Sequence, residues 1–267
     1  MKTTLITGAS GGIGEAIANR LAGRKQNLLL IARNAEKLKE QCVQLSEKFG
    51  IQAQFIAADL SKPETAFEIF KEAAERGMEI EMLINNAGIG SGGEFSTISL
   101  QSELDLLQLN ISSLVALTHL FLPQMQDRQA GTIVNLSSMA SFMPVPYMAT
   151  YAASKAFVRS FTEAITQECK PHQVHVLLFA PGLTKTKFNA SAGIDNERAL
   201  GLGADYESAS TQTPEQVADE LIKALDKHRN FAISGSKNRL GAKLLALLPN
   251  AMITRSIANS YRKRLKK

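Results

Sequence analysis

The chain has 267 residues, of which 45% are hydrophobic and 21% charged, as is ordinary for a globular protein with one well-filled core. Its net charge of +5 is unevenly placed, because six cations crowd the last turns: Arg255, Arg262, Lys263, Arg264, Lys266 and Lys267. The rest of the chain is near neutral, which argues against a nucleic-acid-binding surface spread over the molecule.

The two cysteines, Cys42 and Cys169, form no CxxC motif and fall within helical patterns. They indicate packing roles in a reducing compartment, and we expect no metal site. The N-terminus, MKTTLITGAS, lacks the apolar run of a secretory signal. No stretch approaches the roughly 18 to 20 apolar residues of a membrane span. We therefore expect a cytoplasmic protein.

The chain opens with a β-prone run at residues 3–7, followed at once by a glycine-rich turn, GASGGIG, at residues 8–14. A helical pattern with Ile13, Ile17 and Leu21 four apart comes next. In a strand, glycine turn and helix, backbone N–H groups and the helix N-terminus can receive a phosphate. The alternative is a plain tight turn.

The next strand, at residues 28–31, is continuously apolar, as expected of a strand covered on both faces. It ends in Ala32, Arg33 and Asn34, without a carboxylate. At this place in a dinucleotide-binding fold, an acidic residue selects a free 2′-hydroxyl and an arginine selects a 2′-phosphate. Arg33 therefore favours NADP over NAD, unless it is merely a solvated loop cation.

Helices and strands continue to alternate. The predicted elements are a helix at 35–49 with Gly50 as its stop, a strand at 51–57, a helix from a capping box at 61–64 to Gly77, a strand at 80–85, a helical region from 99 to about 125, a strand at 132–137, a helix through Glu168, a strand at 174–179, a helix starting at 213–215, and a seventh strand at 231–234. Residues 187–212 are polar and irregular and suit a mobile cover. The pattern predicts an α/β fold: a single-domain, doubly wound parallel sheet at residues 1–237, with helices on both faces, and an amphipathic basic extension at 238–267.

Residues 138–155, SMASFMPVPYMATYAASK, follow the fifth predicted strand. Tyr151 and Lys155 are spaced i, i+4, one above the other on a helix face, and with Ser138 they could carry out acid–base chemistry. Apolar residues near them suit a hydrophobic carbonyl substrate, or else pack under a loop; they are Phe142, Met143, Pro144, Val145 and Met148, with Phe188 after the sixth strand. Asn110 interrupts the apolar face of the long helical region.

Five motifs, each at a predicted strand end or just after one, resemble those of the short-chain dehydrogenase/reductase family. They are TGASGGIG from Thr7, NNAG from Asn85, Ser138 thirteen residues before Tyr151, the Tyr-x-x-x-Lys spacing that ends at Lys155, and Pro181-Gly182. The resemblance runs from residue 3 to about residue 234.

The resemblance implies that Tyr151 donates a proton in reduction and accepts one in the reverse direction. Lys155 would hydrogen-bond the nicotinamide ribose and bring the tyrosine pKa, normally about 10, toward working pH. Ser138 would hold the substrate carbonyl oxygen, and Asn110 would anchor a water relay. The implied cofactor-lining residues are Gly8, Ser10, Gly12, Ile13, Gly14, Arg33, Asp59, Leu60, Asn86, Ala87, Gly88, Tyr151, Lys155, Pro181, Gly182, Thr184 and Thr186.

One departure concerns the cofactor. Many NADP-using members carry a basic residue before the second motif glycine, where this chain has Gly11, so the prediction of NADP rests mainly on Arg33. The tail, residues 240–267, has three alternatives: it covers the substrate pocket or a neighbouring subunit, rests on an anionic membrane surface, or is a solvated helix.

The favoured function is an NADPH-dependent reductase of a hydrophobic ketone, aldehyde or 3-oxoacyl group. An alcohol or hydroxysteroid dehydrogenase working in the oxidative direction is the first alternative. A non-catalytic NADP(H) sensor or scaffold is the second, although such a protein would be expected to lose Tyr151 or Lys155. By analogy with the family, a homo-oligomer (dimer or tetramer) is expected.

Overall fold

The computed structural model describes residues 1–186, 188, 211–245 and 247–265. Seven parallel strands form one sheet in the order β3-β2-β1-β4-β5-β6-β7. The strands are β1 (Lys2–Thr7), β2 (Leu28–Ala32), β3 (Ala53–Ala57), β4 (Glu79–Asn85), β5 (Gly131–Leu136), β6 (Val174–Ala180) and β7 (Phe231–Ile233). The strand order reverses between β1 and β4, and ligands of such sheets bind at the carboxyl ends beside this point. The predicted doubly wound parallel sheet is confirmed.

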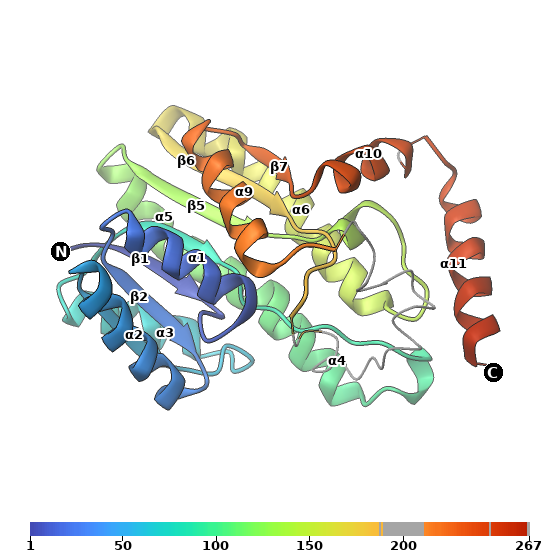
Figure 1. Ribbon diagram of the computed structural model, residues 1–267, viewed down its shortest axis with the longest axis horizontal. Helices are drawn as coiled ribbons and strands as arrows, with labels where there is room; N and C mark the ends of the chain where they lie inside the picture. The colour runs from blue at the N-terminus through green and yellow to red at the C-terminus, as the bar shows by residue number, and fades with distance from the viewer. Residues whose placement is uncertain (187, 189–210, 246, 266–267) are drawn as a thin grey trace.

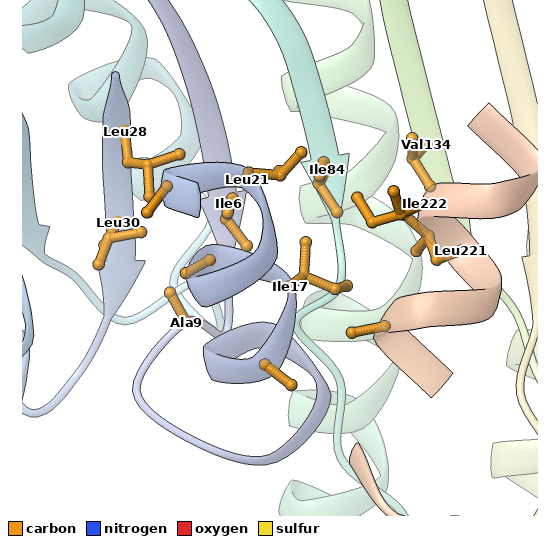
Figure 2. Close-up of a cluster of buried hydrophobic side chains, with 14 of the residues drawn as sticks. Ile6, Ala9, Ile17, Leu21, Leu28, Leu30, Ile84, Val134, Leu221 and Ile222 are labelled. Carbon is orange, nitrogen blue, oxygen red and sulfur yellow. The ribbon is translucent and has the colours of Figure 1, made fainter. Parts of the chain in front are cut away.

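Helices cover both faces of the sheet (Figure 1). One layer consists of α1 (Gly12–Gly23), α2 (Ala35–Phe49) and α9 (Pro214–Asp226). The opposite layer consists of α3 (Thr65–Glu75), α5 (Ser113–Asp127) and α6 (Ala149–Cys169). Figure 2 shows the first layer's core, where side chains of α1 and α9 meet those of four strands: Ile6, Ala9, Ile17, Leu21, Leu28, Leu30, Ile84, Val134, Leu221 and Ile222.

The strands are apolar because both of their faces are covered. Leu28, Leu29, Leu30 and Ile31 of β2 are all 0% exposed, as their continuous apolar sequence predicts. Both cysteines are also buried and unpaired, in agreement with packing roles.

The helix boundaries follow local capping chemistry. Asn34 accepts a hydrogen bond from the N–H of Lys37 at the start of α2, and Gly50 ends that helix in the left-handed conformation at φ 64°. The predicted capping box at residues 61–64 is wrong. No side chain caps α3, and the Ser61 hydroxyl instead donates to Asp59 Oδ1 at 2.8 Å.

A long apolar helical run, Leu100–Asp127, passes through α4 (Leu100–Leu107), the π-helical turn η2 (Gln108–Ser112) and α5. Its mean hydropathy of 1.4 would suit a membrane span, contrary to the expectation from the sequence, but length and composition alone are weak evidence. Leu106, Leu117 and Phe121 of this run are at most 2% exposed and pack into the core, and 39% of its most apolar window is buried.

The chain ends in α10 (Ser236–Leu245) and α11 (Asn250–Leu265), which run along one edge of the molecule in Figure 1. These helices correspond to the predicted basic extension, whose division from the main domain stays a prediction. The predicted mobile cover at residues 187–212 lies outside the described residues, apart from Phe188, Thr211 and Gln212.

Candidate active site

The glycine-rich turn between β1 and α1 depends on residues without a Cβ atom. Gly8 and Gly12 have φ values of 65° and 55°, and a Cβ on Gly14 would lie 2.3 Å from the Gly8 carbonyl oxygen. No side chain caps α1 at Gly11. The helix N-terminus therefore presents backbone N–H groups, in a cradle that a side chain would fill, which fits the pyrophosphate of a dinucleotide.

Asn86, after β4, holds this turn in place. Its Nδ2 donates to the carbonyl oxygens of Thr7 at 2.8 Å and Gly8 at 3.2 Å. The Thr7 hydroxyl in return accepts from the N–H groups of Asn86 and Ala87, at 3.0 and 2.9 Å. Asn86 and Ala87 were predicted to line the cofactor; their hydrogen bonds join β4 to the glycine turn, and direct cofactor contact stays a prediction.

Two cations lie near the predicted adenosine end of the site. Arg33 is exposed at the end of β2. Burial alone would raise the pKa of Asp59, but hydrogen bonds from Ser61 and the charge of nearby Arg33 lower it overall. Lys37, in the first turn of α2, places Nζ 3.8 Å from where a Cβ on Gly11 would be and 3.2 Å from Glu15 Oε2.

Lys37 was not predicted, because basic residues were sought only within the glycine turn and at the end of the second strand. The lysine reaches the same corner from a different element. The sequence did contain a sign of its position. Lys37 lies in the first helical turn after the Asn34 cap, and that turn follows directly on the strand end that carries Arg33.

Tyr151 and Lys155 lie in α6, and Ser138 follows the end of β5. Tyr151 and Lys155 are 8% and 5% exposed. Ser138 hydrogen-bonds the Tyr151 side chain, and its Oγ also accepts from the N–H of Ala140 at 3.1 Å. Lys155 Nζ donates to the Leu136 carbonyl oxygen at 3.1 Å. The structure therefore brings the three predicted residues together at one strand end.

Burial dominates the acid–base properties of this group. Burial raises the pKa of Tyr151, and the hydrogen bond from Ser138 only partly opposes that effect. Burial also lowers the pKa of Lys155 to about 8. The expected lowering of the tyrosine pKa is therefore not found in the cofactor-free protein. Desolvation of the phenolate outweighs the hydrogen bond from Ser138, while Lys155 Nζ is engaged by the Leu136 carbonyl oxygen.

Asn110 lies in the π-helical turn η2 and is 1% exposed. It makes two hydrogen bonds with the Ile89 backbone, at 3.0 and 2.9 Å, and donates to Ser154 Oγ at 3.0 Å. A Cβ on Gly88 would lie 3.1 Å from Asn110 Oδ1 and 3.3 Å from Lys155 Nζ. The side chains of Asn110 and Lys155 thus both approach the backbone at Gly88. π-helical turns such as η2 are frequent at functional sites.

The segment after β6 carries the predicted nicotinamide residues. The Pro181 carbonyl oxygen accepts from the N–H of Met139 at 3.0 Å, and Thr184 pairs with Gln212 in an isolated bridge. A Cβ on Gly12 would lie 3.0 Å from Thr186 Cγ2. The segment therefore reaches back to the glycine turn, as a loop that covers a bound dinucleotide would.

Asn238 of α10 fixes the start of this segment. A Cβ on Gly182 would lie only 2.0 Å from Asn238 Nδ2, and Asn238 also donates to the Ser234 carbonyl oxygen at 2.8 Å. Gly182 is thus a close-contact position, and it ties the nicotinamide segment to the C-terminal helices.

The predicted substrate residues lie in two places. The Phe188 ring lies 5.4 Å from the ring of Tyr151, beside the reacting group. The Phe142 ring instead packs 6.1 Å from the ring of Phe231 and under the guanidinium of Arg159 at 4.4 Å. These contacts describe packing for Phe142, and its role toward substrate stays a prediction. The same holds for Met143 and Met148, which are half-buried.

Tyr147 is a further residue that the sequence analysis missed. It has φ 67°, and its ring stacks on Tyr261 of α11 with 3.8 Å between ring centroids and 15° between planes. Arg262 Nε donates to Tyr147 Oη at 3.0 Å. The end of α11 therefore contacts the segment that leads into Tyr151.

Three comparisons relate the chain to known proteins. A family model described as short chain dehydrogenase matches residues 2–197. Hydroxysteroid dehydrogenase-like protein 1 of Gallus gallus is 33% identical over 208 residues, 77% of this chain and 62% of that protein. Very-long-chain 3-oxoacyl-CoA reductase of Anas platyrhynchos is 35% identical over 189 residues, 69% of this chain and 60% of that protein. The chain thus matches less than two-thirds of the length of either relative.

A solved structure agrees with these matches. The short-chain dehydrogenase from Sphingobium yanoikuyae, in complex with NADPH, has a TM-score of 0.79 at 29% identity, with 87% of both chains covered. The family model covers most of the chain, and the fold is the one that this solved structure has. The chain belongs to the short-chain dehydrogenase/reductase family.

Proposed function

We propose that the protein is an NADP(H)-dependent reductase that converts a hydrophobic ketone, aldehyde or 3-oxoacyl group into an alcohol. The observation that carries the proposal is the group formed by buried Tyr151 and Lys155 with half-buried Ser138 at the end of β5, which shares the carboxyl edge of the sheet with the glycine turn. In the proposed reductase, this arrangement would set an acid beside the nicotinamide.

When bound, NADPH would supply a hydride to the carbonyl carbon. Ser138 would hold the carbonyl oxygen, and Tyr151 would protonate it. Because burial raises the pKa of Tyr151, the phenol is fully protonated near neutral pH, as an acid must be. Lys155 would stabilise the phenolate that is left, and the proton would be restored past Asn110, which approaches the same point at Gly88.

The same pKa direction supports this proposal over the oxidative alternative at neutral pH. A dehydrogenase needs a phenolate to accept the alcohol proton, and a raised tyrosine pKa disfavours the phenolate. The sensor alternative needs no acid at all, so a buried, hydrogen-bonded Tyr151 would have no purpose in it.

Preference for NADP(H) is supported by Arg33 and Lys37, two cations at one corner, and by the absence of a carboxylate at residues 32–34. The NADPH complex of the similar Sphingobium protein agrees with it. In the Arg33→Ala/Lys37→Ala variant, kcat/KM with NADPH should fall about 10- to 100-fold, as expected for lost charge-assisted bonds to a phosphate, while kcat/KM with NADH stays nearly unchanged. The matched control is Lys39→Ala, an exposed lysine of the same helix. An equal fall with both cofactors would contradict the assignment.

The substrate class is inferred from the apolar side chains Met143, Met148 and Phe188, and from the names of the relatives, which include 3-oxoacyl-CoA and steroid-type enzymes. The test is NADPH oxidation by the purified protein with 3-oxoacyl thioesters of increasing chain length, bulky ketones, aldehydes and a small hydrophilic ketone. We expect kcat/KM to rise with apolar size. A preference for the small hydrophilic ketone would contradict the substrate class, and NADPH binding without turnover on any carbonyl would favour the sensor.

A further inference from the structure

We propose that the outer side of α10 and the start of α11 form a docking surface for an anionic lipid bilayer. We call this surface the apolar edge; its residues are Leu240, Leu244, Leu247, Leu248 and Met252. It lies along the border of the molecule that α10 and α11 form in Figure 1. The proposal is independent of the reaction assigned above.

The apolar edge is exposed although its residues are large and hydrophobic. Leu240 and Leu244 are 61% and 55% exposed, and Leu247, Leu248 and Met252 are 80%, 47% and 60% exposed. Five of the 13 large hydrophobic side chains found exposed among the described residues thus fall within residues 240–252. Such concentrations are rare on a protein surface that contacts only water.

The helices keep these side chains facing outward. Ala242, on the inner side of α10, is 7% exposed and packs with Ala180 and Ile233 at the edge of the sheet. Ile253 of α11 is also 7% exposed, and Tyr261 near its end stacks on Tyr147. Contacts at both ends therefore hold the segment on the body of the protein, with its leucines on the outside.

The charge of the same segment identifies the occupant. Asp226 is the last acidic residue of the chain, so residues 1–226 carry a net charge of −6 and residues 227–267 a net charge of +11. Lys237, Lys243 and Arg255 are exposed, and the described residues give none of the three an ion-pair partner. Leucines beside unpaired cations on one helical surface match the interface of a bilayer with anionic lipids.

A second copy of the chain fits this surface less well. A symmetric contact through the apolar edge would bring two +11 segments together, and neither segment contains a carboxylate to offset the repulsion. A bilayer with anionic lipids can both bury the exposed leucines and neutralise the cations of residues 227–267.

The experiment is flotation of the full-length protein with vesicles of phosphatidylcholine, alone or mixed with phosphatidylserine. We expect the wild-type protein to float with the mixed vesicles at low salt, to be released as salt rises, and to bind pure phosphatidylcholine weakly. Wild-type protein that stays in solution with both vesicle types would overturn the proposal.

Two matched pairs of variants separate the apolar and the charged contributions. The variant Leu244→Gln/Leu247→Gln/Leu248→Gln should lower vesicle affinity about tenfold or more, whereas the control Val43→Gln/Phe67→Gln, exposed apolar residues of α2 and α3, should not. The variant Lys237→Gln/Lys243→Gln/Arg255→Gln should lower affinity for mixed vesicles about a hundredfold. Its control removes the same net charge elsewhere, at Lys39, Lys48 and Lys71.

NADPH binding without vesicles should be equal in all of these proteins, which shows that each is folded. The proposal is overturned if the leucine variant floats as well as its control. It is also overturned if the leucine variant loses only self-association, measured by sedimentation, because the edge would then bind a second copy.

Discussion

The cofactor side and the substrate side of the site are held together by different means. At the cofactor side, backbone lies against backbone: the missing Cβ of Gly14 allows the Gly8 carbonyl oxygen to approach, and Asn86 binds that backbone from β4. At the substrate side, side chains from distant segments meet, as Tyr147 does with Tyr261 and Arg262. The first arrangement leaves no room for an added atom at Gly14, whereas the second can change one side chain at a time. We therefore expect cofactor binding to be the fixed part of the site and substrate choice the variable part.

The largest effect in this comparison is expected from Gly14→Ala. Its Cβ would collide with the backbone at 2.3 Å, and overpacking strain of about 3 kcal/mol corresponds to a loss of about a hundredfold in NADPH affinity if the turn opens to relieve it. NADPH fluorescence titration measures the affinity.

The matched control is Gly11→Ala in the same turn. Gly11 has an extended backbone at φ −178°, and the atom nearest to an added Cβ would be Lys37 Nζ at 3.8 Å. This variant should bind NADPH within a few-fold of the wild type. Equal losses in the two variants would show that close backbone approach is not what fixes the turn.

The next effect concerns the cost of burying Lys155. Its pKa of about 8 lies below the ordinary 10.5, so between these values the unfolded state binds more protons and stability rises with pH. The full cost, about 3 kcal/mol, is present below pH 8. Lys155→Met should therefore abolish turnover yet raise the free energy of unfolding near neutral pH by about 2 kcal/mol, after about 1 kcal/mol for the lost hydrogen bond to Leu136.

Urea unfolding of the cofactor-free proteins at about pH 7 and about pH 10 measures this difference. The advantage of the variant should disappear at the higher pH, where the wild-type lysine is neutral. A variant less stable than the wild type at neutral pH would contradict the conclusion that the buried charge of Lys155 destabilises the folded protein.

The smallest effect is expected at the substrate side. Tyr261→Ala removes the stacked pair with Tyr147, worth about 0.5–1.5 kcal/mol, and should speed hydrogen exchange in α11 up to about tenfold. Tyr147→Phe keeps the stacking and loses only the bond from Arg262, so its exchange should stay close to that of the wild type. Unchanged exchange in Tyr261→Ala would mean that the tyrosine pair does not hold α11.

The same difference explains what the sequence could and could not predict. The glycine turn, Ser138, Tyr151 and Lys155 were predictable because each requirement lies within a few consecutive residues: glycines at fixed spacing, or an i, i+4 pair after an apolar strand. Parallel strands then bring those local motifs to one edge of the sheet. The doubly wound fold followed from the alternation of apolar runs and amphipathic patterns.

Contacts between distant segments gave no such local pattern. Lys37 reaches the glycine turn from α2, Asn238 packs on Gly182, and Tyr261 stacks on Tyr147. The raised pKa of Tyr151 is of the same kind, because it follows from complete burial and not from the neighbouring lysine. The predicted capping box failed since Ser61 binds Asp59 and leaves α3 uncapped.

The central claim is that Tyr151 supplies the proton in a carbonyl reduction, and Tyr151→Phe tests it most directly. The substitution removes one hydroxyl and keeps the ring that lies beside Phe188. We expect NADPH affinity to stay within a few-fold of the wild type while NADPH oxidation with the best carbonyl substrate falls by about 10²- to 10⁴-fold. Turnover equal to that of the wild type, with NADPH bound, would contradict the account.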